Sequence, residues 1–220
     1  MVKIFERGSN EYDRLLPRSL IYRFLARSFS YPGRDYVSAL NNDTLLDCFN
    51  EWQLLGIDAS DEKSRIINWL KVFDQEEVLK ELQIDYTRML INHYPKILVA
   101  PYSSVYLDKD AKVWGPSTAK AARLYQAAGL YMRKDFNEVP DHIAAELEFA
   151  SYLISEQLKQ EKDRAMSSDK LHKIEREFIF DHLLKWAPSF FYQIIEKAST
   201  PFYRQMASLS SKFLDFEASQ

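Results

Sequence analysis

The sequence predicts an all-α fold, a single-domain bundle of about eight to eleven helices with one long, ordered, aromatic-rich loop. The first reason is composition, because the 220 residues include only five glycines and eight prolines. Helix-favouring residues fill most of the rest. The second is periodicity, since apolar residues recur at spacings of three and four. The third is balance, because 46% hydrophobic and 28% charged residues suffice to build a core. At this length one domain, residues 1–220, is expected.

The N-terminal part is expected to form a series of amphipathic helices. The first runs from about Arg18 to Phe29, where apolar residues share one face until the Tyr-Pro-Gly segment at 31–33 ends the pattern. Further helical patterns cover residues 36–55, 61–73 and 76–91.

Two helices in the middle of the chain have clear boundary signals. A helix from Thr118 should end at Gly129, which suits the left-handed position of a Schellman motif, with Leu130 placed for its apolar contact. Pro140 then suits the first position of a new helix, whose apolar stripe continues to Leu158.

The C-terminal part is expected to begin with a solvated loop, because residues 159–169 form a charged stretch. A helix over residues 171–186 follows, and Pro188 is expected to interrupt it. The pattern resumes over residues 190–198, and Pro201 opens a last helix through Phe213.

Residues 92–117 carry three prolines and one glycine and show no sustained helical period. Structureless segments of this length are commonly functional or disordered. Disorder would leave many large apolar side chains in water, so we expect an ordered loop packed on the bundle. The sequence leaves open whether the loop is a structural strap or a binding surface. The side chains concerned are Tyr94, Ile97, Leu98, Val99, Tyr102, Val105, Tyr106, Leu107, Val113 and Trp114.

Charge and cysteine content exclude several classes of function. The formal net charge of −3 gives no basic footprint for nucleic acid, so no nucleic-acid partner is expected. Cys48 is the only cysteine, which excludes an internal disulfide and a cysteine-rich metal site and fits a reducing cytoplasm. No apolar run is long enough for a membrane span or a signal-peptide core, so we expect a cytoplasmic protein without stable membrane insertion.

The sequence contains none of the motifs that are typical of the catalytic sites considered below. The glycine-rich phosphate-binding patterns and the G-x-S-x-G turn of serine hydrolases do not occur. None of the four histidines has a glutamate three residues before it, which argues against a di-iron centre. His142 and Glu146 are interpreted as a helix-surface hydrogen bond, and His182 as a core histidine. We therefore predict no enzyme activity, no cofactor and no metal.

The most specific motif of the chain is Glu138-Val-Pro-Asp-His-Ile-Ala-Ala-Glu-Leu-Glu-Phe149. It is similar to the signature Pro-Asp-His-Ile-x-x-Glu-Leu-x-Phe, and together with several other segments it resembles the TorD/DmsD/NarJ-type family of cytoplasmic molybdoenzyme chaperones, also called redox enzyme maturation proteins. Met89 and Leu90 depart from the usual Leu-Phe, and Ser103 stands where an acidic residue is common. The other matching segments are Leu20–Pro32, Asp85–Leu90, Pro101–Tyr106, Val113–Thr118 and Phe178–Trp186.

The resemblance implies a chaperone that binds the twin-arginine signal region, and sometimes the body, of the catalytic subunit of a molybdopterin oxidoreductase. It would hold the client back from export until the cofactor is inserted. The signal region carries two positive charges followed by an apolar stretch. A chaperone that binds it therefore requires carboxylates beside an apolar groove. Asp141 and Glu146 are candidates for the charge, although Asp141 also suits a helix start and Tyr86 with Leu90 also suits the core. The groove candidates are Tyr86, Met89, Leu90, Tyr102, Tyr106 and Trp114, and the family implicates Pro101, Tyr102, Ser104, Pro140, Asp141 and His142.

Two alternatives stay open at this point. The chain could be a nucleotide-binding or hydrolytic helical protein, or a purely homo-oligomeric scaffold. The expected oligomeric state is a monomer or a helix-swapped dimer, because the charged stretch at 159–169 and the turn at Gly129 can each act as a hinge.

Overall fold

The computed structural model describes residues 11–41, 46–93, 96–132, 139–163 and 169–220. Over these ranges the predicted all-α fold is confirmed, with eleven α-helices, one 3-10 turn, two π-helical turns and no β-strand. None of the described helices is both long and apolar enough to cross a lipid bilayer. The α-helices are α1 Glu11–Ser28, α2 Arg34–Asn41, α3 Phe49–Leu54, α4 Ser60–Leu70, α5 Gln75–Tyr86, α6 Ser103–Leu107, α7 Pro116–Ala127, α8 Ile143–Asp163, α9 Asp169–Phe178, α10 Leu184–Lys197 and α11 Pro201–Ala218.

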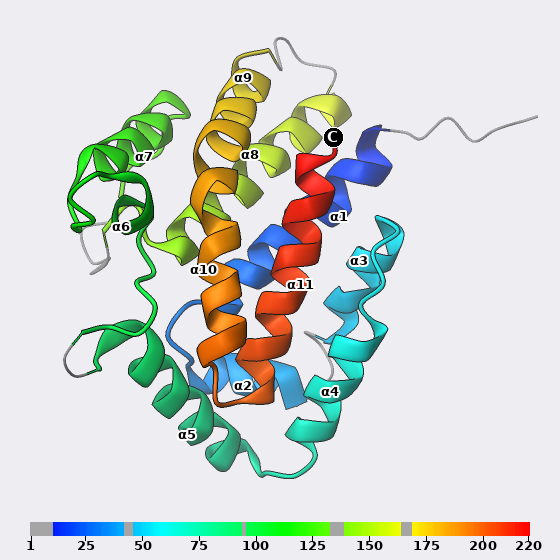
Figure 1. The fold of residues 1–220 in the computed structure, drawn as a ribbon. Helices are drawn as coiled ribbons and strands as arrows, with labels where there is room; N and C mark the ends of the chain where they lie inside the picture. The colour runs from blue at the N-terminus through cyan, green and yellow to red at the C-terminus, as the bar shows by residue number, and fades with distance from the viewer. Residues whose placement is uncertain (1–10, 42–45, 94–95, 133–138, 164–168) are drawn as a thin grey trace, which may run out of the picture.

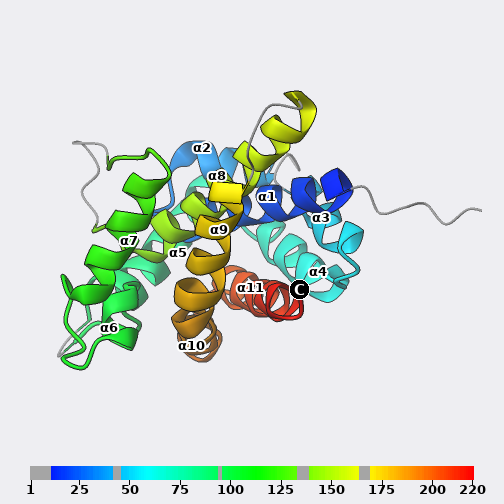
Figure 2. The ribbon, with the colours of Figure 1, turned by 90° about the horizontal axis from the view of Figure 1, so that it is seen from above.

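The helices pack in two layers with smaller helices at the flanks. Helices α10 and α11 run side by side in front, and α1 and α8 cross behind them (Figure 1). Seen from above, α6 and α7 lie at one side of these layers and α3 and α4 at the other (Figure 2). Helix α8 therefore has one face toward α1 and the core, and another toward the flank that carries α7.

Aromatic side chains fill the space between the layers. Tyr22 of α1 meets Phe213 of α11 edge to face, with ring centroids 4.8 Å apart. Phe29, just after α1, packs on Phe190 and Phe191 of α10 at 5.9 and 5.1 Å. All five side chains are essentially inaccessible to water. Burial of this size is the main stabilising contribution to the fold.

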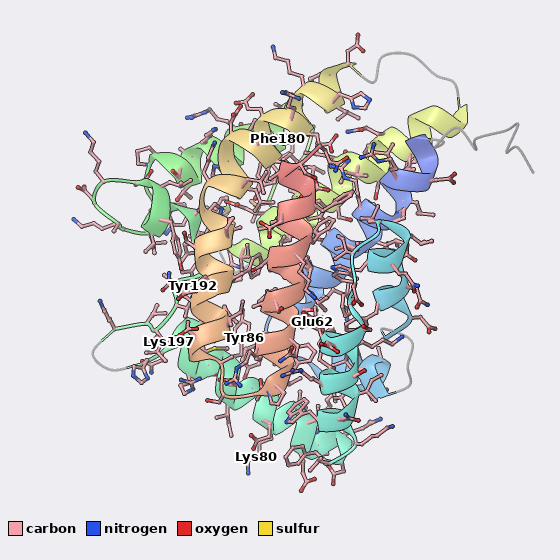
Figure 3. All side chains as sticks on the ribbon, turned by 45° about the vertical axis from the view of Figure 1, so that its right-hand side comes forward. Glu62, Lys80, Tyr86, Phe180, Tyr192 and Lys197 are labelled. Carbon is pink, nitrogen blue, oxygen red and sulfur yellow. The ribbon has the colours of Figure 1, made fainter. Side chains whose placement is uncertain are left out.

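A buried ionic cluster ties the two ends of the chain together. The Arg18 guanidinium donates to both carboxylate oxygens of Glu217 at 2.7 Å and to Glu175 at 2.8 Å. Burial lowers the pKa of Arg18, but the hydrogen bond and charge of Glu217 outweigh it and hold that pKa above its usual value. A second link joins α4 to α11, where Glu62 accepts from Ser208 at 2.8 Å and pairs with Lys212 at 2.7 Å (Figure 3).

The predicted end of the helix at Gly129 is confirmed in detail. Gly129 has a φ of +83°, and its N–H donates to the Gln126 carbonyl at 2.9 Å. The Leu130 N–H donates to the Tyr125 carbonyl at 2.9 Å, which completes the Schellman pattern. The predicted start at Pro201 is also confirmed, with the preceding threonine as the side-chain cap.

Several boundary predictions are wrong. The helix expected over residues 36–55 is divided, because α2 ends at Asn41 and α3 begins at Phe49. The charged stretch at 159–169 is helical as far as Asp163, since Lys, Gln and Glu favour helix. Pro188 lies inside α10, and the hydrogen-bond pattern changes instead at the π-helical turn Ile179–Leu183 just ahead of it.

Candidate functional site

Two segments that the sequence analysis singled out lie against each other. We call residues 101–104 the strap and residues 140–143 the turn. The backbones of Tyr102 and His142 form an isolated antiparallel bridge, and their ring centroids are 5.5 Å apart. The flanking bonds run from Ser103 N–H to the Asp141 carbonyl at 3.0 Å and from Ile143 N–H to the Pro101 carbonyl at 2.8 Å. The strap and the turn therefore form one structural unit.

Asp141 is a buried helix cap rather than an exposed charge. Its side chain is fully inaccessible, and its Oδ2 accepts the Ser104 N–H at 2.9 Å in the first turn of α6. Helix α8 begins at Ile143, so Pro140 is not its first residue and Asp141 does not lie in its first turn, contrary to the expected helix start. The turn interrupts the helical path because its backbone groups are engaged by the strap.

His142 caps the N-terminus of α8. Its Nδ1 accepts the Ala144 N–H at 3.1 Å, two residues into the helix, as N-cap side chains do. The ring is 3% exposed, and burial lowers its pKa to about 4, although the nearby Asp141 opposes the shift. The imidazole is therefore neutral near pH 7 and can act as an acceptor. The expected hydrogen bond from the His142 ring to Glu146 is replaced by this cap.

Glu146 joins α8 to the helices in front of it. Its two carboxylate oxygens lie 2.6 Å from His182 Nε2 and 2.8 Å from Trp186 Nε1. All three side chains are buried, and burial raises the pKa of Glu146 while His182 and Trp186 oppose that rise. His182 is thus the core histidine that the sequence indicated. Glu146 acts as an internal tie and offers no charge at the surface.

The segment Asp85–Leu90 is also structural. Tyr86, Met89 and Leu90 are buried in the core, and Tyr86 lies near the lower ends of α10 and α11 (Figure 3). The Asp85 carboxylate accepts the Ser199 N–H at 3.0 Å together with the N–H and hydroxyl of Thr200 at 2.7 and 2.9 Å. It therefore holds the turn between α10 and α11.

The two remaining aromatic candidates lie on the flank formed by α6 and α7. Tyr106 packs on Trp186 with centroids 5.3 Å apart and accepts from Gln193 at 3.3 Å. Trp114 is 73% exposed and has a φ of +70° in the loop before α7. The structure therefore joins the strap to the turn and packs Tyr106 on Trp186, whereas Trp114 is exposed to solvent.

The outer surface of α8 carries two adjoining hollows. One, of about 680 Å³, lies between the end of α1, the start of α2 and α8, and we call it the arginine hollow. The other, of about 310 Å³, lies between the end of α7 and α8, and we call it the aromatic pocket. The arginine hollow is lined mainly by Arg23, Arg27, Tyr31, Arg34, Asp35 and Ala144, and the aromatic pocket by Tyr125, Leu130, Tyr131, Met132, Phe149 and Tyr152.

Glu148 lines both hollows and is exposed. Successive residues of an α-helix are rotated by about 100°, so Glu148 is about 40° around α8 from Ala144 and about 60° from Ala145. Ala144 faces the arginine hollow and Ala145 the aromatic pocket. Glu148 therefore stands on the ridge between them. The structure offers one carboxylate beside an apolar pocket, as binding of a basic and apolar segment requires.

Residues 58–192 match the protein family described as nitrate reductase delta subunit. The chain therefore belongs to the nitrate reductase delta subunit family. Its strap, turn and α8 all lie within the matched residues, and the resemblance found in the sequence is confirmed.

Three relatives of this chain are named as chaperones. The chain is 30% identical to chaperone protein TorD of Photobacterium profundum over 155 residues, 69% of this chain and 68% of that protein. It is 24% identical to the Tat proofreading chaperone DmsD of Salmonella typhi over 188 residues, 86% and 82% of the two chains. A perchlorate reductase assembly chaperone of Dechloromonas aromatica is 22% identical over 212 residues, 92% and 89%. These relatives confirm the prediction of a chaperone rather than an enzyme.

The fold also agrees with a solved structure. A protein of Archaeoglobus fulgidus, described as a redox enzyme maturation protein, superposes with a TM-score of 0.50 at 24% identity, over 98% of this chain and 99% of that one. At this identity the likeness establishes the shared fold.

Sequence reasoning did not single out Glu148, the exposed carboxylate of the ridge, and named Asp141 and Glu146, which the structure shows to be buried. Glu148 occupies the last of the three unspecified positions of the Pro-Asp-His-Ile-x-x-Glu-Leu-x-Phe signature, so the family pattern did not draw attention to it. The sequence signal that could have identified Glu148 is its position off the apolar stripe of this helix. It lies between Leu147 and Phe149, which are both buried.

Proposed function

We propose that this protein is a cytoplasmic chaperone that binds the N-terminal twin-arginine signal region of the catalytic subunit of a molybdopterin oxidoreductase. It assists insertion of the cofactor and delays export of the client until the client is mature. Membership of the nitrate reductase delta subunit family and the chaperone roles of TorD and DmsD support this proposal.

The observation that carries the proposal is the position of Glu148 beside the aromatic pocket. A twin-arginine signal combines guanidinium groups with a following apolar stretch. Guanidinium groups form strong, charge-assisted hydrogen bonds with carboxylates. The pocket exposes Tyr131 and Met132, at 78% and 37%, next to that carboxylate. Exposed apolar side chains of this size beside a charge are typical of a peptide-binding surface.

The buried residues that the family resemblance implicated take a positioning role in this proposal. Asp141 and the strap hold the turn, His142 caps α8, and Glu146 ties α8 to α10. Together they fix the position of α8 along its axis and its rotation about that axis, and α8 is the helix that carries Glu148. We propose that substitutions at these positions change binding by moving the ridge, because their side chains are inaccessible to a peptide.

A peptide comparison tests the proposal directly. One synthetic peptide carries adjacent arginines followed by an apolar stretch, and a second has both arginines replaced by alanine and the apolar stretch made polar. Calorimetry with the full chain should show binding of the first peptide only, with a negative heat-capacity change, the mark of apolar burial. Equal binding of the two peptides by the folded protein would refute signal recognition.

A variant pair tests the place of binding. Glu148→Gln should weaken binding of the twin-arginine peptide by roughly three- to tenfold, because one exposed charge-assisted contact is lost. Glu177→Gln is a matched control, since Glu177 is an exposed glutamate on α9 outside both hollows. Unchanged affinity of Glu148→Gln would place the binding site elsewhere.

A further inference from the structure

Charge is distributed unevenly on the two sides of the Glu148 ridge. Arg23 and Arg27 lie one helical turn apart on the exposed face of α1, and Arg34 opens α2 beside them. On the other side the aromatic pocket is lined by apolar and aromatic side chains apart from Glu148 itself. Across α8 the surface therefore changes from basic to acidic to apolar.

On the α1 and α2 side of the ridge, with Glu148 counted as part of the ridge itself, basic side chains outnumber acidic ones. Arg34 pairs with Glu76 at 2.5 Å, so its charge is largely offset. Asp35 also lines the arginine hollow and offsets part of the remaining charge. The Arg27 guanidinium lies 6.0 Å from the centroid of the Tyr36 ring, which orients it without neutralising it. Arg23 and Arg27 both keep exposed, charged side chains.

A basic region next to the ridge conflicts with simple twin-arginine binding. A peptide with positive charges throughout its N-terminal part would be repelled by Arg23 and Arg27. The repulsion becomes attraction if acidic residues of the peptide precede its arginines. The arginines then reach Glu148, and the apolar stretch enters the aromatic pocket.

We propose that the groove selects client peptides in which acidic residues, a basic pair and an apolar stretch follow one another in that order. The inference rests on the proposed function and specifies its client class and the direction of binding. The N-terminal end of the peptide lies over α1 and α2, and its C-terminal end lies against α7.

Three synthetic peptides test this order with the full chain. All carry adjacent arginines and the same apolar stretch. The first has a pair of aspartates before the arginines, the second has asparagines there, and the third has the aspartates after the apolar stretch. At low salt the first should bind about five- to tenfold more tightly than the other two, because two exposed ion pairs form. The preference should shrink as salt is added.

A charge-reversal variant provides the second half of the test. Arg23→Glu combined with Arg27→Glu should abolish the preference for the first peptide or favour the second. The protein should still fold, because both side chains are exposed. Arg65→Glu, an exposed site on α4 outside both hollows, is the matched control and should keep the preference.

The outcomes separate this inference from the proposed function. Equal affinity for all three peptides, each lost when the arginines become alanine, would overturn the charge order and leave signal binding intact. Equal affinity for the first and third peptides would overturn the direction. If the affinity depends neither on the aspartates nor on the arginines of the peptide, both the inference and the proposed function are overturned.

Discussion

Substitutions of Asp141 distinguish a role in folding from a role in peptide binding. Asp141 is a residue that the family resemblance implicates in signal binding. The carboxylate is fully buried, and its Oδ2 accepts the Ser104 N–H at 2.9 Å. Ser104 is also fully buried, so its N–H has no access to water. Asp141→Ala removes the acceptor and leaves that donor unsatisfied, whereas Asp141→Asn keeps an oxygen in place and removes the charge.

The structure gives different magnitudes for the two substitutions. A hydrogen bond to a charged group contributes about 1.5–3 kcal/mol, and an orphaned buried donor costs about 1–3 kcal/mol. Both figures refer to the same hydrogen bond and are not added together. Asp141→Ala should therefore lower the unfolding free energy by about 3 kcal/mol. Asp141→Asn should cost about 1 kcal/mol. For a chain of this size, Tm falls by about 2–4 °C per kcal/mol, so we expect decreases of about 6–12 °C and 2–4 °C.

The assay combines denaturant and thermal unfolding with calorimetry of twin-arginine peptide binding well below each Tm. Asp110→Ala is the control, because Asp110 is exposed in the loop between α6 and α7. We expect the loss of stability to follow the order alanine, asparagine, control. An Asp141→Ala protein with wild-type stability and no peptide affinity would refute this reasoning and make Asp141 a direct contact.

Four further predictions follow from the buried contacts and the exposed loop. Glu217→Ala should cost about 3–5 kcal/mol in denaturant unfolding, since it leaves the Arg18 guanidinium buried without its main partner. Burial lowers the pKa of His142 from 6.5 to about 4, so the unfolded chain binds the proton more readily than the folded one. The unfolding free energy should therefore be highest above pH 6.5 and fall by about 3 kcal/mol as pH falls toward 4. His142→Asn keeps a cap but cannot titrate, so its unfolding free energy should depend less on pH over that window. Asp85→Asn should cost about 2–3 kcal/mol, because three donors lose a charged acceptor; wild-type stability would contradict its role in the α10–α11 turn. Trp114→Ala should change stability by less than about 0.5 kcal/mol and leave peptide affinity unaltered, because the side chain is exposed at the far end of α7 from the aromatic pocket, roughly 18 Å along the helix.

Helices were predictable where local signals agree with one another. The stripe of α8 and the end of α7 at Gly129 depend on side-chain periodicity and on one left-handed residue, and both can be recognised in the sequence. The π-helical turns Thr87–Ile91 and Ile179–Leu183 could not, because their hydrogen bonds shift by one residue without a change in apolar spacing. The short helix α6 was missed because its start depends on Asp141, which is remote in sequence.

The candidate site was predictable as a set of segments but not as a surface. The strap and the turn were both recognised, and the structure brings them into contact. Whether a carboxylate faces water or a backbone N–H depends on its tertiary neighbours. Asp141 and Glu146 were therefore assigned the role that we propose for Glu148. The hollows beside Glu148 combine α1, α2, α7 and α8, and no local pattern indicates that such helices meet.

The buried residues and the exposed ridge are connected by the geometry of α8. A shift of α8 by one residue in register would rotate its side chains by about 100°, enough to move Glu148 from the ridge to one side. The start of α8 is fixed by the His142 cap and by the bond from Ile143 to the strap, and its rotation is fixed by Glu146 through Trp186. Each of these contacts is internal, yet each determines where the single exposed carboxylate of the ridge stands. A binding defect at any of them is therefore expected even though a bound peptide would touch none of them.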